Sequence, residues 1–190
     1  MTAIAKVRVG GAWVDSVLEG YARVGGVFIP FAPGGDPDPG DQSLFTGETP
    51  SNVAEDGVAL SQGIKFRSSR AGTVSMGRWW AGASPPTSAK CALYRVSDQV
   101  QLAVATFGSM SSLAWTNKAY SAPVAILADT DYMAVCWTSN RYPYTPGYSF
   151  PHVSGDLTAL ASYFKVSADI AYPDGASSLN FNCDLVFNRS

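Results

Sequence analysis

The stretch Leu179-Asn-Phe-Asn-Cys-Asp-Leu-Val-Phe187 alternates apolar and polar side chains near the end of the 190-residue chain. A repeat of two residues is typical of a β-strand with one face in a hydrophobic core. We therefore expect a strand that divides its side chains between two faces: Phe181, Cys183, Leu185 and Phe187 on the buried side, and Asn180, Asn182 and Asp184 on the other.

The chain from residue 43 onward consists of similar short segments separated by turn residues. Residues 131–138, Asp-Tyr-Met-Ala-Val-Cys-Trp-Thr, are almost continuously apolar, as expected of a central strand. Segments 90–96 and 100–107 flank the polar turn Ser97-Asp98-Gln99 and predict a hairpin. Residues 157–164 are the one stretch interpreted as one or two turns of helix. Further strands are predicted at 58–68, 72–80, 113–121 and 124–127.

Many short strands with turns between them predict an all-β fold. We expect a jelly-roll-like antiparallel β-sandwich over residues 42–190. Residues 32–41, Ala-Pro-Gly-Gly-Asp-Pro-Asp-Pro-Gly-Asp, predict a linker, because three prolines exclude a helix or an interior strand. The three aspartates of this linker resemble part of a calcium loop, but the alternating prolines and the missing twelfth-position glutamate disfavour calcium.

An N-terminal arm, residues 1–31, contains a repeat. Arg8-Val-Gly-Gly-Ala-Trp13-Val is followed 15 residues later by Arg23-Val-Gly-Gly-Val-Phe28-Ile. Paired glycines favour the tight turns of two-residue loops, so each copy predicts a short hairpin. Because a single hairpin is marginal in water, we expect the arm to attach to a partner surface, with Arg8, Trp13, Arg23 and Phe28 as the contact residues.

The composition excludes several classes of protein. Charged residues make up 15% of the chain, against about 25% in an average soluble domain. The net charge is −2 and Lys and Arg do not cluster, so we expect no binding to nucleic acid. No apolar run has the ~20 residues of a membrane span, and the start lacks the apolar run of a signal peptide. We therefore expect synthesis in a cytoplasm without ordinary secretion, and no membrane insertion.

Three cysteines without a paired motif are expected to be reduced core thiols: Cys91, Cys136 and Cys183.

Catalytic patterns are missing from the sequence. The chain has a single histidine, no Gly-x-Ser-x-Gly turn, no phosphate loop and no convincing carboxylate pair. We expect no enzyme activity, no cofactor and no metal site.

The segment from Arg141 to His152, Arg-Tyr-Pro-Tyr-Thr-Pro-Gly-Tyr-Ser-Phe-Pro-His, concentrates aromatic residues between prolines. Rings on a stiff loop provide stacking faces for a ligand or receptor. The candidate binding residues are Arg141, Tyr142, Tyr144, Tyr148 and His152. The alternative interpretation is that the loop buries its own rings against the sandwich.

Both parts of the chain resemble known families. The arm resembles the N-terminal segments of minor tail proteins of phages infecting actinobacteria, which carry copies of Val-Gly-Gly-x-Trp-Val. The body resembles a domain-of-unknown-function family of β-sandwiches from actinobacterial and phage surface proteins, although Trp79-Trp80 stands where that family favours an aromatic–Tyr pair. The segments that carry the second resemblance are 60–66, 72–78, 92–94, 122–126, 131–132 and 182–187.

The resemblance implies a non-enzymatic virion structural protein, a minor tail or tail-tip component with a role in host-surface adhesion. It would be made in the host cytoplasm, released by lysis and bound to other virion proteins. By analogy with three-fold fibres and tail tips, and because closed symmetry buries uncharged surface, we expect a homo-oligomer, a trimer. The alternatives are a capsid decoration or head-fibre protein, and a module that binds a host cell-envelope glycan through the loop 141–152.

Overall fold

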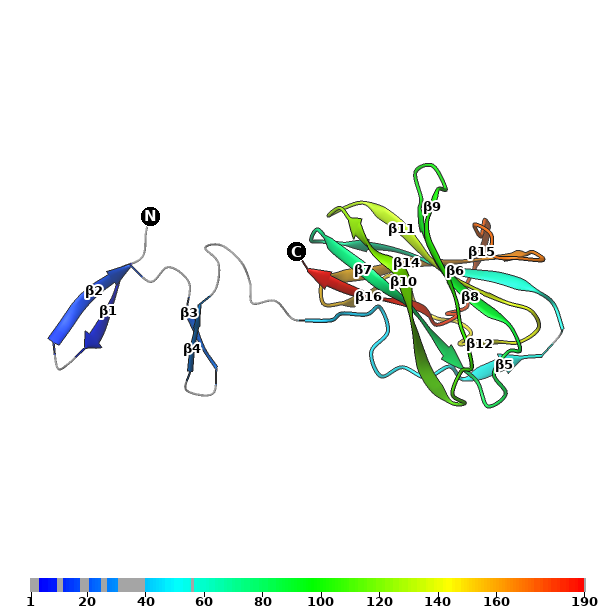
Figure 1. Cartoon of the computed structure of the whole chain (residues 1–190), viewed down its shortest axis with the longest axis horizontal. Coiled ribbons are helices and arrows are strands. Elements are labelled where there is room, and N and C mark those ends of the chain that lie inside the picture. Colours follow the sequence, from blue (N-terminus) through cyan, green and yellow to red (C-terminus); the bar gives the residue numbers. More distant parts are fainter. Residues whose placement is uncertain are drawn as a thin grey trace. The chain divides into compact units, whose positions relative to one another are not determined.

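The computed structural model describes residues 40–55 and 57–189 in full, and the backbone of residues 4–9, 12–17, 21–24 and 27–30. The chain divides into two compact units, Met1–Asp38 and Pro39–Ser190, shown in Figure 1. Most of the predicted linker, up to residue 39, lies outside the described residues.

The first unit contains two antiparallel hairpins, one for each copy of the repeat. Strand β1 (Ile4–Val9) pairs with β2 (Ala12–Val17), and β3 (Tyr21–Val24) pairs with β4 (Val27–Pro30). Arg8 stands opposite Trp13, and Arg23 stands opposite Phe28. The two copies therefore share one register, as the repeat predicts. The glycine turns and all arm side chains lie outside the described residues, so the attachment role of these four residues stays a prediction.

The second unit is an all-β sandwich, which confirms the predicted fold class (Figure 1). Its larger sheet is antiparallel, with the strand order β13 (His152–Ser154), β14 (Leu157–Val166), β6 (Leu60–Ser68), β11 (Asp131–Thr138), β8 (Ala89–Arg95) and β9 (Gln101–Thr106). A short strand, β15 (Gly175–Ser177), also pairs with β14. The smaller sheet has the order β10 (Ala114–Ile126), β7 (Gly72–Ala81) and β16 (Cys183–Arg189). The strands β5 (Asn52–Ala54) and β12 (Tyr142–Tyr144) form a separate pair.

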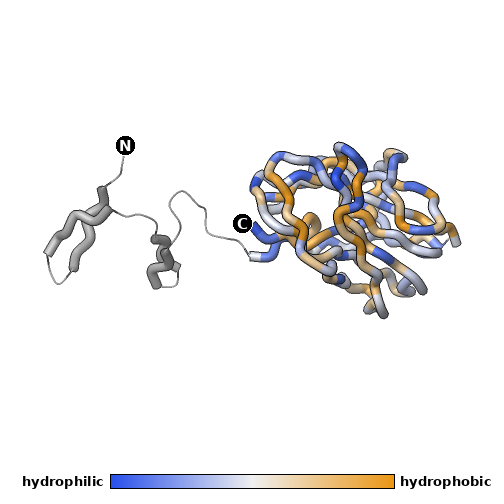
Figure 2. The backbone as a smooth tube through the Cα atoms, turned by 45° about the horizontal axis from the view of Figure 1, so that its top comes forward, coloured by the Kyte–Doolittle hydropathy of each residue, from blue (hydrophilic) through white to orange (hydrophobic). Residues whose placement is uncertain are grey.

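The chain crosses repeatedly from one sheet to the other, from β6 to β7 to β8 and from β9 to β10 to β11. These crossings place sequence neighbours on opposite sheets, as in a jelly roll. Figure 2 shows apolar and polar residues alternating along the strands of this unit. The alternation turns one face of each sheet toward a shared core.

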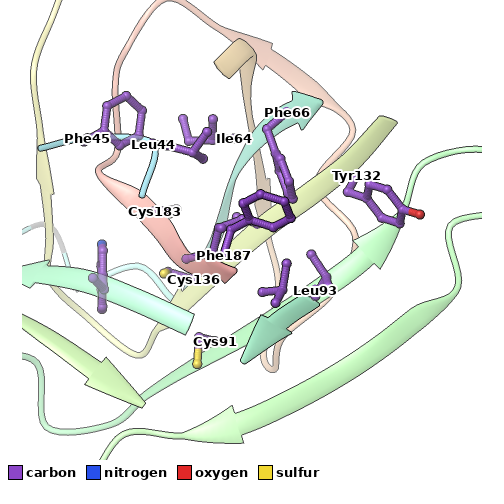
Figure 3. Close-up of a cluster of buried hydrophobic side chains, with 14 of the residues drawn as sticks. Leu44, Phe45, Ile64, Phe66, Cys91, Leu93, Tyr132, Cys136, Cys183 and Phe187 are labelled. Carbon is purple, nitrogen blue, oxygen red and sulfur yellow. The ribbon is translucent and has the colours of Figure 1, made fainter. Parts of the chain in front are cut away.

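Figure 3 shows part of this core, in which side chains from β6, β8 and β11 meet those of β16. Phe181, Cys183, Leu185 and Phe187 are buried, as their alternation predicts. Each fully buried ring contributes about 2–3 kcal/mol of hydrophobic stabilisation. Gly77 of β7 permits close packing, because a Cβ at this position would overlap Cys91 and lie 3.1 Å from the Tyr120 hydroxyl.

All three cysteines are buried free thiols, as predicted. Burial raises the pKa of Cys91 to about 12. Burial, followed by the neighbouring Cys183 thiol, also raises the pKa of Cys136 well above its usual value. The thiol of Cys183 donates to the carbonyl oxygen of Gln62 at 3.3 Å. Cys91 and Cys136 are thus held as neutral core side chains.

Two predictions of local structure are wrong. Residues 157–164, predicted as helical turns, belong to the strand β14. A bulge between Ala159 and Ala161 shifts the register, so the residues opposite the inner positions of β6 change from Leu157 and Ala159 to Ser162 and Phe164, which breaks the two-residue repeat of a strand. The segments 113–121 and 124–127 are joined in one bulged strand, β10, whose register against β7 shifts between Ala119 and Val124.

Candidate functional site

A short segment, Gln42–Phe45, closes one side of the sandwich, and we call it the strap. Gln42 exchanges two backbone hydrogen bonds with Phe187 of β16, at 2.8 and 2.9 Å. The backbone N–H groups of Leu44 and Phe45 donate to the carboxylate of Asp184, at 2.7 and 3.3 Å. The strap therefore covers the polar side of β16, and this explains why Asp184, expected on the non-core face, is buried.

The Asp184 carboxylate is held by a complete set of partners. Besides the strap, it accepts from the N–H of Leu185 at 2.7 Å and faces Arg78 Nη1 at 3.3 Å. Burial raises the pKa of Asp184 to about 7, while its N–H donors and Arg78 act in the opposite direction. Each oxygen of this buried carboxylate has two partners within the fold, and together they tie the strap to β16.

A second carboxylate, Asp156, anchors the start of the strap. Gln42 Nε2 donates to Asp156 at 2.7 Å, and the Asp156 N–H donates back to Gln42 Oε1 at 2.7 Å. Arg189 makes a bidentate ion pair with the same carboxylate at 2.8 Å. Hydrogen bonding to Arg189 is the main reason why the pKa of Asp156 is lowered.

One part of the predicted binding loop packs against the residues that follow the strap. The Tyr148 hydroxyl donates to the Glu48 carboxylate at 2.8 Å, and His152 Nε2 lies 3.6 Å from the same carboxylate. Phe45 contacts both rings, with centroids 5.9 Å from Tyr148 and 5.7 Å from His152. Burial, followed by the bond to Glu48, raises the pKa of Tyr148. Through these contacts with Phe45 and Glu48, Tyr148 and His152 hold the loop 141–152 against the sandwich.

The other part of the loop lies on β12 and faces a different group of residues. The Tyr142 ring is 6.0 Å from Phe181 and 6.1 Å from Tyr144. Arg141 Nε lies 3.5 Å from the Glu55 carboxylate. The described residues thus show the five candidate residues in two groups, with Tyr142, Tyr144 and Arg141 separate from Tyr148 and His152. A binding role for these residues remains a prediction.

Tyr142 also lines a pocket of about 330 Å³. The pocket lies where the first residue of β6 pairs with the last residue of β14, Leu60 opposite Val166. Residues of β12 and of the segment 177–181 complete the lining of the pocket. The lining is uncharged and mostly apolar: Val58, Leu60, Tyr142, Phe164, Val166, Ser177, Leu179 and Phe181.

Two buried polar side chains without hydrogen-bond partners belong to strands that contribute to the pocket, although neither is among its lining residues. Gln62 is 0% exposed and Ser162 is 1% exposed. Neither the amide atoms of Gln62 nor the hydroxyl of Ser162 has a partner. Gln62 follows Leu60 by two residues and stands opposite Phe164, so the strand alternation places its side chain on the same inner face as these two lining residues. Other buried side-chain atoms without a hydrogen-bond partner are Asn180 Nδ2, both amide atoms of Asn182 and Trp115 Nε1.

Most of the pocket residues were missed by the sequence reasoning. Leu60, Phe164 and Val166 have the pattern of ordinary core positions, and Tyr142 alone was among the candidates. The available signal was Gln62, a polar residue at a core position of a β-pattern.

Among the described residues, no three side chains of His, Cys, Asp or Glu are grouped so that they could hold a metal ion. The same residues contain no helix long and apolar enough to span a bilayer.

The family model described as "Domain of unknown function (DUF4082)" matches residues 47–182, and the chain belongs to this family. The matched region contains every pocket residue, together with Gln62 and Ser162. It leaves out the repeat arm, the strap and β16. A search of curated proteins finds no match.

Proposed function

We propose that this member of the family is a non-enzymatic structural protein of a phage particle, a minor tail or tail-tip component whose sandwich meets the host surface. The observation that carries the proposal is the arm, in which two hairpins place an arginine opposite an aromatic residue in the same register. A repeated hairpin of this size gains stability by adding to a larger surface. Two copies with one register suit two equivalent positions on a virion partner.

The division of the chain supports the same proposal. The family match covers most of the sandwich, from residue 47 to residue 182, and does not extend into the arm. An attachment device joined to a self-contained sandwich is the arrangement expected of a displayed module. The low content of charged residues suits assembly with other virion proteins and with further copies of the chain, as a trimer.

A deletion tests the attachment role. We expect a chain without residues 1–33 to fold with the thermal midpoint of the intact sandwich, because the sandwich has its own core, and to be absent from purified particles. The double variant Trp13→Ala/Phe28→Ala, which keeps the full chain, is expected to show the same loss. Normal incorporation of both variants would refute the proposal.

A particle map locates the protein. Density for the sandwich at the tail tip, in three copies around an axis, is the expected result. Density on the head would support instead the capsid decoration or head-fibre alternative.

A further inference from the structure

The pocket at the β6–β14 end presents ring faces. Tyr142, Phe164 and Phe181 all line it, and Phe164 is 39% exposed. Rings at such a site pack against the flat apolar face of a ligand. A pyranose ring has such a surface where several of its axial C–H bonds gather on one face.

The pocket suits an uncharged ligand. None of its lining residues is charged. Lys165, which lies between the lining residues Phe164 and Val166, is on the opposite face of β14 and pairs with Asp174 at 2.7 Å. A phosphate or carboxylate would therefore lose its hydration without gaining a counter-charge.

The unpartnered groups on the strands of the pocket separate two classes of neutral ligand. The Gln62 amide offers two donor hydrogens and one acceptor oxygen, and the Ser162 hydroxyl both donates and accepts. A buried polar group without a partner destabilises the fold, so these groups gain most from a ligand that both donates and accepts. Sugar hydroxyls have this property, whereas a hydrocarbon chain does not.

We infer that this pocket binds a neutral saccharide, with its apolar face against Tyr142 and its hydroxyls toward Gln62 and Ser162. Gln62 and Ser162 are buried and do not line the pocket as it stands, so the inference requires the partly exposed side chain of Phe164, which stands opposite Gln62, to turn aside and admit a hydroxyl. The inference rests on the proposed function, because it supplies the contact to the host surface. It also moves the site from the loop 141–152 as a whole to the pocket, with Tyr142 as the shared residue.

Saturation-transfer NMR on the full chain tests the inference, with glucose, galactose, mannose, arabinose and rhamnose as separate probes and octanol as the apolar comparison. We expect at least one sugar to bind with a Kd on the order of 1 mM, typical of a small site. Tyr142→Ala and Gln62→Leu should each weaken that binding about tenfold or more. Gln62→Leu should keep or raise the thermal midpoint, because it removes a buried amide whose hydrogen bonds are unmade.

Three outcomes would overturn the inference. Octanol binding without sugar binding would make the pocket a hydrocarbon site. Sugar binding that survives Gln62→Leu would place the sugar elsewhere. A lower thermal midpoint for Gln62→Leu would show that the amide is satisfied inside the fold.

The two proposals fail separately. Particles that carry Gln62→Leu should assemble normally and adsorb poorly to host cells. Normal incorporation of the arm variants would refute the virion attachment while leaving the sugar measurements on the isolated chain intact.

Discussion

The strap side and the pocket end of the sandwich both contain buried polar side chains, but these side chains are paired on the strap side and unpaired at the pocket end. On the strap side, Asp184 and Asp156 are surrounded by donors from the strap and from two arginines. At the pocket end, Gln62 and Ser162 are buried on strands that contribute to the pocket and have no partner.

This difference separates a structural role from a binding role. Buried polar groups are normally paired, and a paired group holds the chain that supplies its partner. The strap is held in that way. An unpaired group lowers stability and gains when a ligand supplies the missing bonds. Variants should therefore change stability on the strap side and ligand binding at the pocket end.

The largest effect is expected for Asp184→Ala. The change leaves the Arg78 guanidinium and the N–H groups of Leu44 and Phe45 without their acceptor. Removing one partner of a buried ion pair costs about 3–5 kcal/mol in the free energy of unfolding. Denaturant unfolding measures the change. Asp98→Ala, which removes an exposed partner of Arg95, is the control and should leave the unfolding curve unchanged.

The pH dependence of stability should show a smaller effect from the same carboxylate. The folded-state pKa of Asp184 is raised to about 7 from an ordinary value of 3.8. The folded state therefore holds a proton that the unfolded state has lost, and the contribution of Asp184 falls as pH rises from 3.8 to about 7. The fall is at most about 4 kcal/mol, since one pKa unit corresponds to about 1.4 kcal/mol.

Asp156 acts in the opposite direction. Its pKa is lowered, so the stability it contributes is present above pH 3.8 and is lost as the pH falls below it. Unfolding curves across this range check both signs. In Asp184→Asn the fall toward pH 7 should disappear while the loss at acid pH remains. A fall that persists in this variant would assign it to another group.

Much of the fold follows from the sequence because its cause is local. The repeat of the arm predicts two hairpins, and the alternation predicts a strand that the structure has from Cys183 onward, although Asn180 and Asn182, expected on the other face, are buried too. The bulge in β14 was not predicted, because it depends on pairing with β6. The burial of Asp184 was not predicted either, since it depends on a strap 139–140 residues away.

The site was less accessible to sequence reasoning for a related reason. The composition of the loop 141–152 predicts one binding surface, but in the structure Tyr148 bonds to Glu48 while Tyr142 lines the pocket. The pocket is lined by residues of β6, β12 and β14 and of the segment 177–181, which are far apart in the sequence and come together only in the assembled fold. Gln62 is visible as a polar residue in an apolar pattern, yet only the structure shows that it lacks a partner.

Tyr148→Phe tests the strap side with a smaller change. It removes the hydroxyl that donates to Glu48 at 2.8 Å and keeps the ring against Phe45. A hydrogen bond of this kind contributes about 1–2 kcal/mol to stability. The free energy of unfolding should fall by that amount, and sugar binding by the variant should equal that of the wild type. A loss of sugar binding would mean that the two groups of loop residues act as one site.

The smallest effect on stability, and the closest test of the comparison, uses two matched valines. Val166 at the pocket and Val153 on β13 are 66% and 67% exposed, so replacing either with serine removes similar exposed apolar surface. Each change should alter the free energy of unfolding by no more than about 0.5 kcal/mol. Val166→Ser also removes part of the pocket wall, and binding of whichever sugar the wild type accepts should weaken by about two- to fivefold, a difference of up to about 1 kcal/mol. Val153→Ser lies outside the pocket and should leave that binding unchanged. Because stability is matched between the two, a difference in sugar binding can only come from the pocket, and equal binding by both would remove Val166 from the site.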